Sequence, residues 1–232
     1  MRLALTIFTA FVLLAAAPGE AQNNEDFGEQ RREMTASLRV EYNIENENLL
    51  QALSTVPRHR FVPSSYDNLA YSNTTIPLGK GLTAPSPGYY ARIFRDTDQL
   101  ENKRVLVLGF GTGYAAALLS RLADSVFIIE FSGELASQYE TTFSSLGYSV
   151  NITDSRNRLA WSEEAPFDFV FIHGAVRKVP ADVINLLGPD GVLLFSLAND
   201  AGFQFMVRIK RSGELFMIEE NGDSFLPLID TL

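Results

Sequence analysis

The segment Gly109-Phe110-Gly111-Thr112-Gly113 constrains the fold of this 232-residue chain more than any other. It follows an apolar run of strand length, Arg104 to Leu108, and precedes a helical pattern from Gly113 to Ala123. A glycine turn between a strand and a helix places free backbone N–H groups and the positive end of the helix dipole against a ligand. Glycine also permits positive φ and a close approach of ligand atoms. An ordinary strand–helix turn is the alternative, but the flanking elements favour a nucleotide-type ligand site.

Apolar runs and helical patterns alternate through the second half of the chain. This alternation predicts a doubly wound α/β fold, with a mostly parallel sheet covered by helices on both faces. The last two runs, joined by Ser212-Gly213, predict an antiparallel hairpin that closes one sheet edge. The further strands are expected at Ser125–Ile129, Tyr148–Ile152, Phe167–Ile172, Gly191–Leu197, Phe203–Lys210 and Glu214–Glu219, and the further helices at Ser132–Leu146 and Ala181–Leu187.

The first 21 residues have the pattern of an export signal. Met1-Arg2 is a basic start, Leu3 to Ala17 is almost uninterrupted apolar sequence, and Pro18 stops it. This predicts a signal peptide removed after Ala21, and therefore an exported protein, periplasmic or secreted. An uncleaved membrane anchor is the alternative, although the run is shorter than the ~20 residues that a span prefers. After cleavage we expect no membrane contact.

The sequence predicts that residues 22–100 form an N-terminal extension of helices and loops. This extension precedes a Rossmann-like core at residues 101–232. The first helix of this extension has only a weak apolar stripe, which ends at Val40, and Pro57 ends the second helix. The helices are expected at Asp26–Glu41, Glu47–Val56 and Gly88–Asp96, with a loose polar leader at Asn23–Gln30 and a loop-rich stretch at Phe61–Pro87.

Composition excludes several kinds of chemistry. The chain has no cysteine, so disulfides, thiolate catalysis and zinc–cysteine sites are impossible. Only His59 and His173 are present, so we expect no histidine-rich metal site. A Ser-His-Asp hydrolase would also need a G-x-S-x-G turn, which the sequence lacks. The net charge is −9, and an acidic surface repels phosphate backbones, so general nucleic-acid binding is disfavoured.

The spacing of the glycines selects the type of cofactor. A dinucleotide-binding turn has the form G-x-G-x-x-G, which would require glycine at position 114, where Tyr114 stands. The G-x-G-x-G form present here is the one that S-adenosylmethionine enzymes use. Glu130 ends the next strand, 130 − 109 = 21 residues after the first glycine, and a carboxylate there can accept both hydroxyls of a ribose. The alternative for Glu130 is a solvated glutamate at a strand end.

A series of short motifs runs through nearly the whole chain. In order they are Val56–Pro63, Ala70-Tyr71, Ile76–Gly79, Val105-Leu106, Gly109–Tyr114, Ala165–Asp168 and Phe225–Leu228. Their order and spacing resemble those of the protein-L-isoaspartate O-methyltransferase family, from about Arg31 to Leu228. That family has a doubly wound sheet with an N-terminal helical extension and a C-terminal antiparallel closure, which agrees with the elements expected above.

The resemblance implies a function and a set of site residues. Members of this family transfer a methyl group from S-adenosylmethionine to the α-carboxylate of isoaspartyl residues in damaged proteins. The candidate catalytic residue is Ser86, and the candidate partners are isoaspartyl proteins or peptides. The residues implied for the cofactor are Gly109, Phe110, Gly111, Gly113, Glu130, Ser155 and Arg156, and those implied for the substrate are Thr83, Pro85 and His173.

The chain departs from the family pattern on the substrate side. The family serine of the loop over the active site falls on Pro85, so Ser86 can replace it only if the loop shifts. His173 stands where the family has Thr or Ala. It would lie at the floor of the active site, or would be a loop histidine bonded to backbone.

The chain departs from the pattern on the cofactor side as well. The acidic residue before the first glycine is Val107, and the family's Gly-Asp pair near the adenine falls on Ser155-Arg156. Asp154 is close enough in sequence to take over that contact, while Arg156 would place a cation near a positively charged sulfonium.

Three functions stay open. The first is the methyltransferase, which is favoured because an ionised carboxylate needs mainly alignment with the methyl group. The second is a catalytically degenerate relative that binds a ligand or peptide, because S-adenosylmethionine is made inside cells and acidic contacts are missing. The third is a nicotinamide-dependent oxidoreductase, which Tyr114 disfavours.

Overall fold

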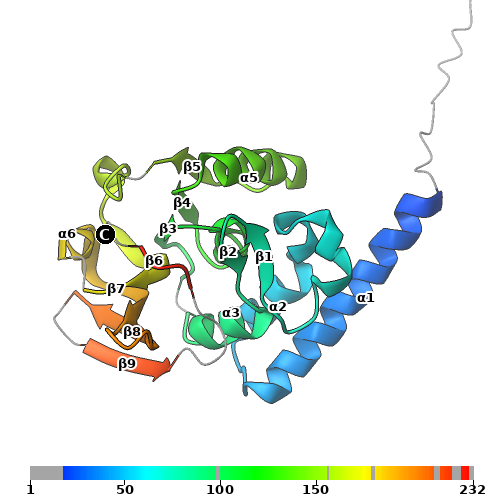
Figure 1. The fold of residues 1–232 in the computed structure, drawn as a ribbon, viewed down its shortest axis with the longest axis horizontal. Coiled ribbons are helices and arrows are strands. Elements are labelled where there is room, and N and C mark those ends of the chain that lie inside the picture. Colours follow the sequence, from blue (N-terminus) through cyan, green and yellow to red (C-terminus); the bar gives the residue numbers. More distant parts are fainter. Residues whose placement is uncertain are drawn as a thin grey trace, which may run out of the picture.

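The computed structural model of the chain describes residues 18–97, 100–155, 157–178, 181–211, 215–220 and 226–229. Among these residues the central sheet has the strand order β5-β4-β3-β6-β7-β8-β9 (Figure 1). Strands β3 to β7 pair in parallel, and β8 and β9 continue the sheet antiparallel beyond β7. The expected doubly wound sheet with an antiparallel hairpin at one edge is confirmed. The strands are β3 Arg104–Gly109, β4 Ser125–Glu130, β5 Asn151–Asp154, β6 Phe167–Val176, β7 Leu187–Ala198, β8 Gln204–Lys210 and β9 Leu215–Glu220.

The two faces of the sheet are covered unequally. Helices α3 Pro87–Phe94, α4 Gly113–Leu119 and α5 Gly133–Leu146 contribute to one large apolar cluster, into which Val105 and Val107 of β3 point. Leu106 and Leu108 point into the opposite cluster, which includes residues of α6 Ala181–Ile184 and lies next to η3 Ser162–Glu164. Because both faces of β3 are buried, the strand reads as one continuous apolar run.

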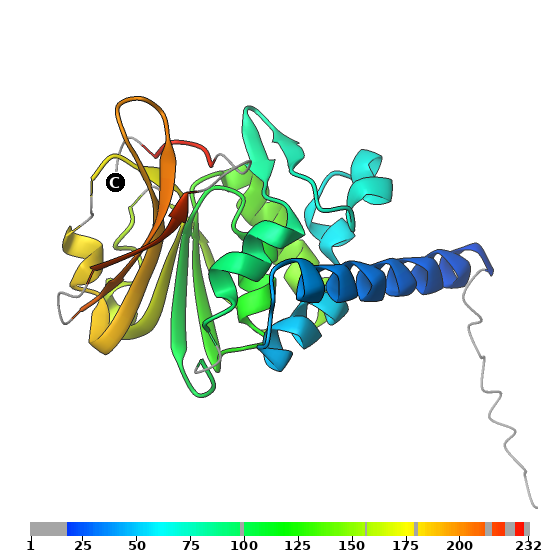
Figure 2. The same ribbon diagram turned by 90° about the horizontal axis from the view of Figure 1, so that it is seen from below.

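The N-terminal extension packs on the same side as α4 and α5. In Figure 2 its first helix reaches outward from the body, on the side away from β8 and β9. No helix of the described residues is long and apolar enough to cross a bilayer. The elements of the extension that precede α3 are α1 Pro18–Glu41, α2 Glu47–Thr55, η1 Arg58–Phe61, η2 Ser64–Leu69, β1 Ile76–Gly79 and β2 Leu82–Ala84.

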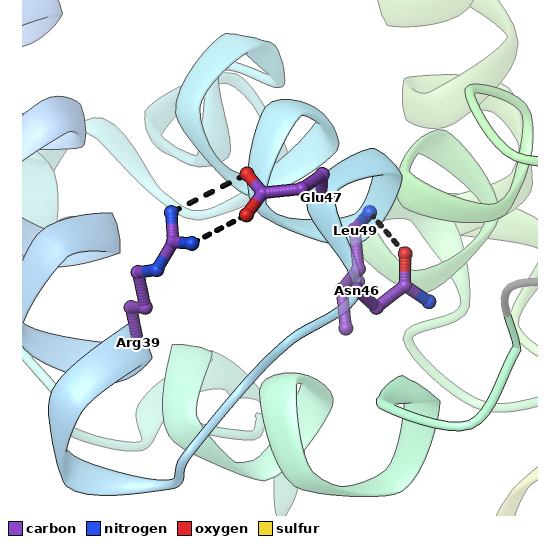
Figure 3. A network of polar contacts seen from close by, with 4 residues as sticks. All are labelled: Arg39, Asn46, Glu47 and Leu49. Atoms are coloured by element: carbon purple, nitrogen blue, oxygen red, sulfur yellow. Dashed lines mark hydrogen bonds and ion pairs between the residues drawn. The ribbon is translucent and has the colours of Figure 1, made fainter.

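The junction between α1 and α2 follows ordinary capping rules. Asn46 caps α2 by accepting a hydrogen bond of 3.0 Å from the backbone N of Leu49, and Glu47 places a carboxylate in the first turn (Figure 3). Arg39 forms a two-point ion pair with Glu47. Both charged side chains are more than half exposed, so the pair adds at most about 1 kcal/mol. Burial of apolar residues such as Leu38 contributes more to this junction.

Most of the elements expected from the sequence are confirmed to within a few residues. The stretch Phe61–Pro87, which was expected to be loop-rich, contains the hairpin of β1 and β2, and further differences concern details. The expected loose leader at Asn23–Gln30 is helical, because α1 begins at Pro18, which tolerates the first helical position, and runs on into the segment that packs through Met34 and Leu38. Val40 is 84% exposed, since it lies off the stripe formed by Met34 and Leu38. Strand β5 begins at Asn151 rather than Tyr148. The apolar stretch at residues 1–17 and the Ser212-Gly213 turn lie outside the described residues, and the cleavage after Ala21 stays a prediction.

Candidate functional site

The carboxyl edge of the parallel strands has a topological switch point between β3 and β6. From β3 the chain winds outward to β4 and β5, then returns to the other side for β6 and β7. Ligands of doubly wound folds bind at such a point. The strand register places Asp154, Glu130, Gly109 and His173 in one row across this edge. The glycine turn therefore begins at the switch point, with Glu130 and His173 beside its first residue.

Two of the three glycines of the turn are required by the packing of the protein itself, and the third is favoured by its backbone conformation. Gly109 has φ +136°, and a Cβ added there would lie 2.2 Å from the carbonyl O of His173. A Cβ at Gly113 would lie 2.6 Å from Cδ1 of Tyr139 on α5. Gly111 has φ +68°, a conformation that glycine adopts without strain. The pattern thus follows from the close approach of β6 and α5, and would be needed with or without a ligand.

Glu130 has a completely buried side chain at the end of β4. Its Oε2 accepts hydrogen bonds of 2.9 Å from both the backbone N and Oγ1 of Thr112, and its Oε1 accepts one of 3.0 Å from the backbone N of Ser132. Burial raises the pKa of Glu130, and the hydrogen bonds from Thr112 and Ser132 oppose that change. The interpretation as a solvated strand-end glutamate is therefore wrong. Glu130 ties the glycine turn to the start of α5, and its contact with ribose hydroxyls stays a prediction.

His173 lies directly beneath the turn with no exposed surface. Its Nδ1 is 2.5 Å from the carbonyl O of Phe110, and its Nε2 is 2.8 Å from Oη of Tyr90. Burial lowers the pKa of His173 to about 4, so the ring is neutral at pH 7. His173 is bonded to backbone, as one alternative predicted, but it lies in strand β6 and not in a loop. A direct contact between this ring and the substrate does not fit a side chain that solvent cannot reach.

The hairpin of β1 and β2 lies over the glycine turn. The Cδ1 atom of Leu78 would be 2.8 Å from a Cβ at Gly111, and the carbonyl O of Thr83 would be 3.6 Å from it. At the tip of the hairpin, Lys80 Nζ is 2.5 Å from Oε2 of Glu134 in the first turn of α5, and Lys80 lowers the pKa of that carboxyl. The structure therefore brings the predicted substrate residue Thr83 to the glycine turn, as expected.

The loop that leads from the hairpin to α3 is held by a buried cation. Arg58 is completely buried and donates hydrogen bonds to the carbonyl oxygens of Ala70 (2.7 Å), Pro85 (2.9 Å) and Thr74 (3.2 Å). Desolvation lowers the pKa of its guanidinium. Pro85 is thus fixed through its backbone, and its ring offers no hydroxyl to a substrate.

Ser86, the candidate catalytic residue, is the N-cap of α3. Its Oγ accepts a hydrogen bond of 3.2 Å from the backbone N of Tyr89. The backbone of Ser86 is unstrained, since its φ of −61° and ψ of 154° are ordinary for an N-cap. The structure gives Ser86 a structural role, and the catalytic role stays a prediction.

Ser155 lies beside Glu130 at the end of β5. Its backbone N donates to the carbonyl O of Glu130 (3.2 Å), and its Oγ accepts from the backbone N of Asn157 (3.0 Å). The neighbouring Asp154 is exposed, and its Oδ2 would be 3.2 Å from a Cβ at Gly133, so this carboxylate stands at the start of α5. Arg156 lies outside the described residues. Contacts of Ser155 and Asp154 with an adenine stay predictions.

The sequence did not single out three residues that organise the site. Thr112 occupies a variable position of the glycine pattern, and only the fold shows that it binds Glu130 twice. Tyr90 reads as one more apolar residue of a helix, and Arg58 as one of two arginines flanking a histidine. No local signal marks them, because each acts through a partner more than ten residues away in sequence.

One hollow of the described residues lies away from the glycine turn. It has a volume of about 740 Å³ and is lined by polar residues of the α1–α2 junction and the end of α3, among them Asn43, Asn46, Glu47, Arg95 and Asp96. Judged by its volume alone, this hollow would be the candidate ligand site. The switch point and the buried carboxylate favour the glycine turn instead.

Comparison with known proteins decides the family. The model of the protein-L-isoaspartate(D-aspartate) O-methyltransferase family matches residues 29–232. The chain belongs to this family. Relatives named protein-L-isoaspartate O-methyltransferase are 34% identical in Roseiflexus sp., over 88% of this chain and 94% of theirs, and 32% identical in Shewanella sediminis, over 93% and 88%.

Two solved structures share the fold of this family member. One is named protein-L-isoaspartate O-methyltransferase and has a TM-score of 0.74, with 21% identity over 87% of this chain and 67% of its own. The other is a Plasmodium falciparum protein named as a β-aspartate methyltransferase, in complex with S-adenosyl-L-homocysteine. It has a TM-score of 0.74 and 15% identity over 87% of this chain and 99% of its own. Both support the Rossmann-like methyltransferase fold.

Proposed function

We propose that this chain is a protein-L-isoaspartate O-methyltransferase that uses S-adenosylmethionine to methylate isoaspartyl carboxylates of exported proteins. The observation that carries the proposal is the buried carboxylate of Glu130 beside a glycine turn at the switch point, in a chain that the family model matches from residue 29 to 232. The match to relatives named for this activity covers 88% and 94% of their length.

The residues of the turn fit the cofactor. Three donors occupy the carboxylate of Glu130, and a carboxylate has about four acceptor sites, so one acceptor site stays free for a ribose hydroxyl. Because Glu130 is completely buried in this structure, a ribose can reach that site only when the turn moves. Phe110, the second residue of the turn, is half-buried and packs edge-to-face on Phe131 with ring centroids 5.4 Å apart. Glu130, Phe110 and the backbone of the glycine turn would hold the cofactor, and Ser155 would border its adenine. When bound, S-adenosylmethionine supplies a methyl group on a positively charged sulfur.

The chain's own residues have mainly to align the acceptor. The substrate carboxylate is ionised at neutral pH because its pKa is ~4, so no base is needed. Ser86 accepts a hydrogen bond from Tyr89 through its oxygen, which leaves its proton available to a substrate carboxylate. One such bond to a charged group is worth about 1.5–3 kcal/mol. The hairpin over the turn would exclude water while the two reactants are held in line.

The proposed compartment follows from the sequence alone. The basic start and the apolar run of residues 3–17 support export and removal of the first 21 residues. The test is cell fractionation followed by N-terminal sequencing of the full chain expressed in a bacterium. We expect an exported protein that begins at Gln22. A protein that begins at Met1 and stays in the cytoplasm would contradict export.

The decisive test of activity combines binding and turnover. Titration calorimetry with S-adenosylhomocysteine should detect binding, and radiolabelled methyl transfer should occur to an isoaspartyl peptide but not to its aspartyl counterpart. Glu130→Ala should abolish both, while the exposed Glu140→Ala on the same side of the domain serves as the matched control. Absence of binding at millimolar S-adenosylhomocysteine would refute the proposal.

A non-catalytic binding module is the second candidate. It is favoured because Pro85 stands where the resemblance predicts the family serine. The carbonyl of Pro85 accepts a hydrogen bond from Arg58, which fixes the loop. Binding of S-adenosylhomocysteine without any methyl transfer to the isoaspartyl peptide would establish this alternative. Thermal stabilisation by NAD but not by S-adenosylhomocysteine would instead point to the oxidoreductase.

A further inference from the structure

His173 holds the backbone of Phe110 at two points. The carbonyl O of His173 accepts a hydrogen bond of 3.1 Å from the backbone N of Phe110, and the imidazole Nδ1 lies 2.5 Å from the carbonyl O of the same residue. Both backbone polar groups of Phe110 are therefore bound to one residue of β6. A carbonyl can only accept, so Nδ1 must carry the proton.

This proton assignment determines the role of the other ring nitrogen. The buried imidazole is neutral, so with Nδ1 protonated its Nε2 is an acceptor. Oη of Tyr90, 2.8 Å away, must then donate to Nε2. The Tyr90 side chain has no exposed surface, and its ring lies nearly parallel to the imidazole, at 11° with centroids 6.0 Å apart. The hydrogen bonds form a directed chain from Tyr90 through His173 to Phe110.

The start of this chain is attached to the substrate side of the site. Tyr90 lies one helical turn after Ser86, the N-cap of α3, and Ser86 directly follows the loop that Arg58 holds at Pro85. The end of the chain is the turn that would bind the cofactor. The hydrogen-bonded pair thus connects the two halves of the site through the interior of the protein.

We propose that Tyr90 and His173 are positioning residues that fix the carbonyl of Phe110 in the cofactor turn and couple it to the substrate-side helix α3. This inference rests on the proposed function. A Thr or Ala at position 173 could not make both bonds, so the pairing depends on the imidazole.

The first test removes the hydroxyl that donates to His173 and, as a control, removes a buried hydroxyl that makes no such bond. Tyr90→Phe deletes the donor to His173 and keeps the ring. Tyr114→Phe is the control, because its equally buried Oη has no hydrogen-bond partner among the described residues and its ring packs against that of Tyr90. By calorimetry Tyr90→Phe should weaken S-adenosylhomocysteine binding about threefold to tenfold. Tyr114→Phe should leave it unchanged.

A second test observes the proton itself. The chain has two histidines, so ¹⁵N-labelled His59→Gln protein has a single imidazole. We expect the Nδ1–H form for His173 without ligand, and a change in its Nδ1–H resonance when S-adenosylhomocysteine binds. Tyr90→Phe should also raise the KM for S-adenosylmethionine more than it lowers kcat, and His173→Gln, which can still donate to the Phe110 carbonyl, should recover more binding than His173→Ala.

The outcomes separate the two proposals. A wild-type chain that binds no S-adenosylhomocysteine refutes the proposed function, and the positioning role with it. A wild-type chain that binds, with equal affinity in Tyr90→Phe and Tyr114→Phe, refutes the positioning role alone. An Nε2–H form of His173 in the unliganded protein refutes it independently of any ligand.

Discussion

The glycine turn at residues 109–113 and the hairpin-to-α3 segment at residues 79–86 face each other, and they relate to their family in opposite ways. The turn has the expected glycine pattern, yet Gly109 and Gly113 are demanded by neighbours within the fold, as the 2.2 Å approach at Gly109 shows. The hairpin segment has Pro85 where the resemblance to the family leads us to expect a serine, yet its backbone is fixed by Arg58 and capped by Ser86.

The difference teaches how retained and lost residues should be weighed. A retained glycine pattern indicates that the strand–turn–helix packs in the family manner, which binding requires but which does not by itself establish binding. A proline at an expected serine position predicts the loss of one hydrogen bond to the substrate, while the contacts of Arg58 still fix the loop around it. On the proposed function, we expect the chemistry of this chain to depend on Glu130, Ser86 and the groups that position them.

The largest effect is expected from Gly109→Ala. The added Cβ would meet the carbonyl O of His173 in a backbone with positive φ, which should cost about 3 kcal/mol or more of unfolding free energy. Gly147→Ala is the control, since Gly147 also has positive φ but nothing within 4 Å, and should cost only about 1 kcal/mol. Urea unfolding measures both. Equal losses in the two variants would show that contact with β6 does not dictate the glycine.

The second effect concerns the pH dependence of stability. The pKa of His173 falls from 6.5 to about 4 on folding, so the unfolded chain binds a proton that the folded chain refuses. His173 therefore contributes stability above pH 6.5 that is lost as the pH falls towards 4, by roughly 3 kcal/mol at most. His173→Asn should flatten this slope in urea unfolding measured from pH 7 to pH 4.

His59 provides the comparison in the other region of the molecule. Its pKa is also lowered to about 4, first by burial and then by Arg31 and Arg60, but its ring is only partly buried, so solvent screens the effect. His59→Asn should flatten the slope less than His173→Asn. Glu130 acts with the opposite sign, because its raised pKa gives stability that is lost as the pH rises through that pKa. A slope unchanged in His173→Asn would contradict the buried neutral imidazole.

The sheet could be predicted from the sequence because its strands are continuous apolar runs. Such runs are typical of strands that are buried on both faces of a sheet. The neighbours of Gly109 could be predicted less well. Glu130 was expected to accept ribose hydroxyls, but its three protein donors include Thr112, whose position a one-dimensional pattern treats as variable. His173 was expected either at the floor of the active site or bonded to backbone, and neither alternative foresaw its second bond to Tyr90, 83 residues earlier. Such pairings depend on which strands and helices become neighbours, which local patterns do not encode.

A moderate effect is expected at the cap of α3. Ser86→Ala removes the hydrogen bond to the backbone N of Tyr89 and should cost about 1 kcal/mol, whereas Ser86→Asn keeps a capping oxygen and should be nearly neutral. Methyl transfer to an isoaspartyl peptide then separates the roles. If Ser86 only caps α3, Ser86→Asn retains wild-type turnover. A tenfold or larger loss in Ser86→Asn at unchanged stability would assign the hydroxyl to the substrate.

The smallest effect is expected at the contact that joins the two regions, the ion pair of Lys80 and Glu134. Both side chains are at least 70% exposed, so solvent and salt screen the attraction and Lys80→Gln should not change the unfolding free energy measurably. The contact nevertheless holds the hairpin tip to the start of α5, above the buried turn. We therefore expect Lys80→Gln to speed both association and dissociation of S-adenosylhomocysteine in stopped-flow measurements at low salt, with little change in affinity. In 0.5 M salt, the rates of the variant and of the wild type should become the same. If they differ as much at high salt as at low salt, the difference does not come from this ion pair, and the hairpin is held by its apolar contact with the turn.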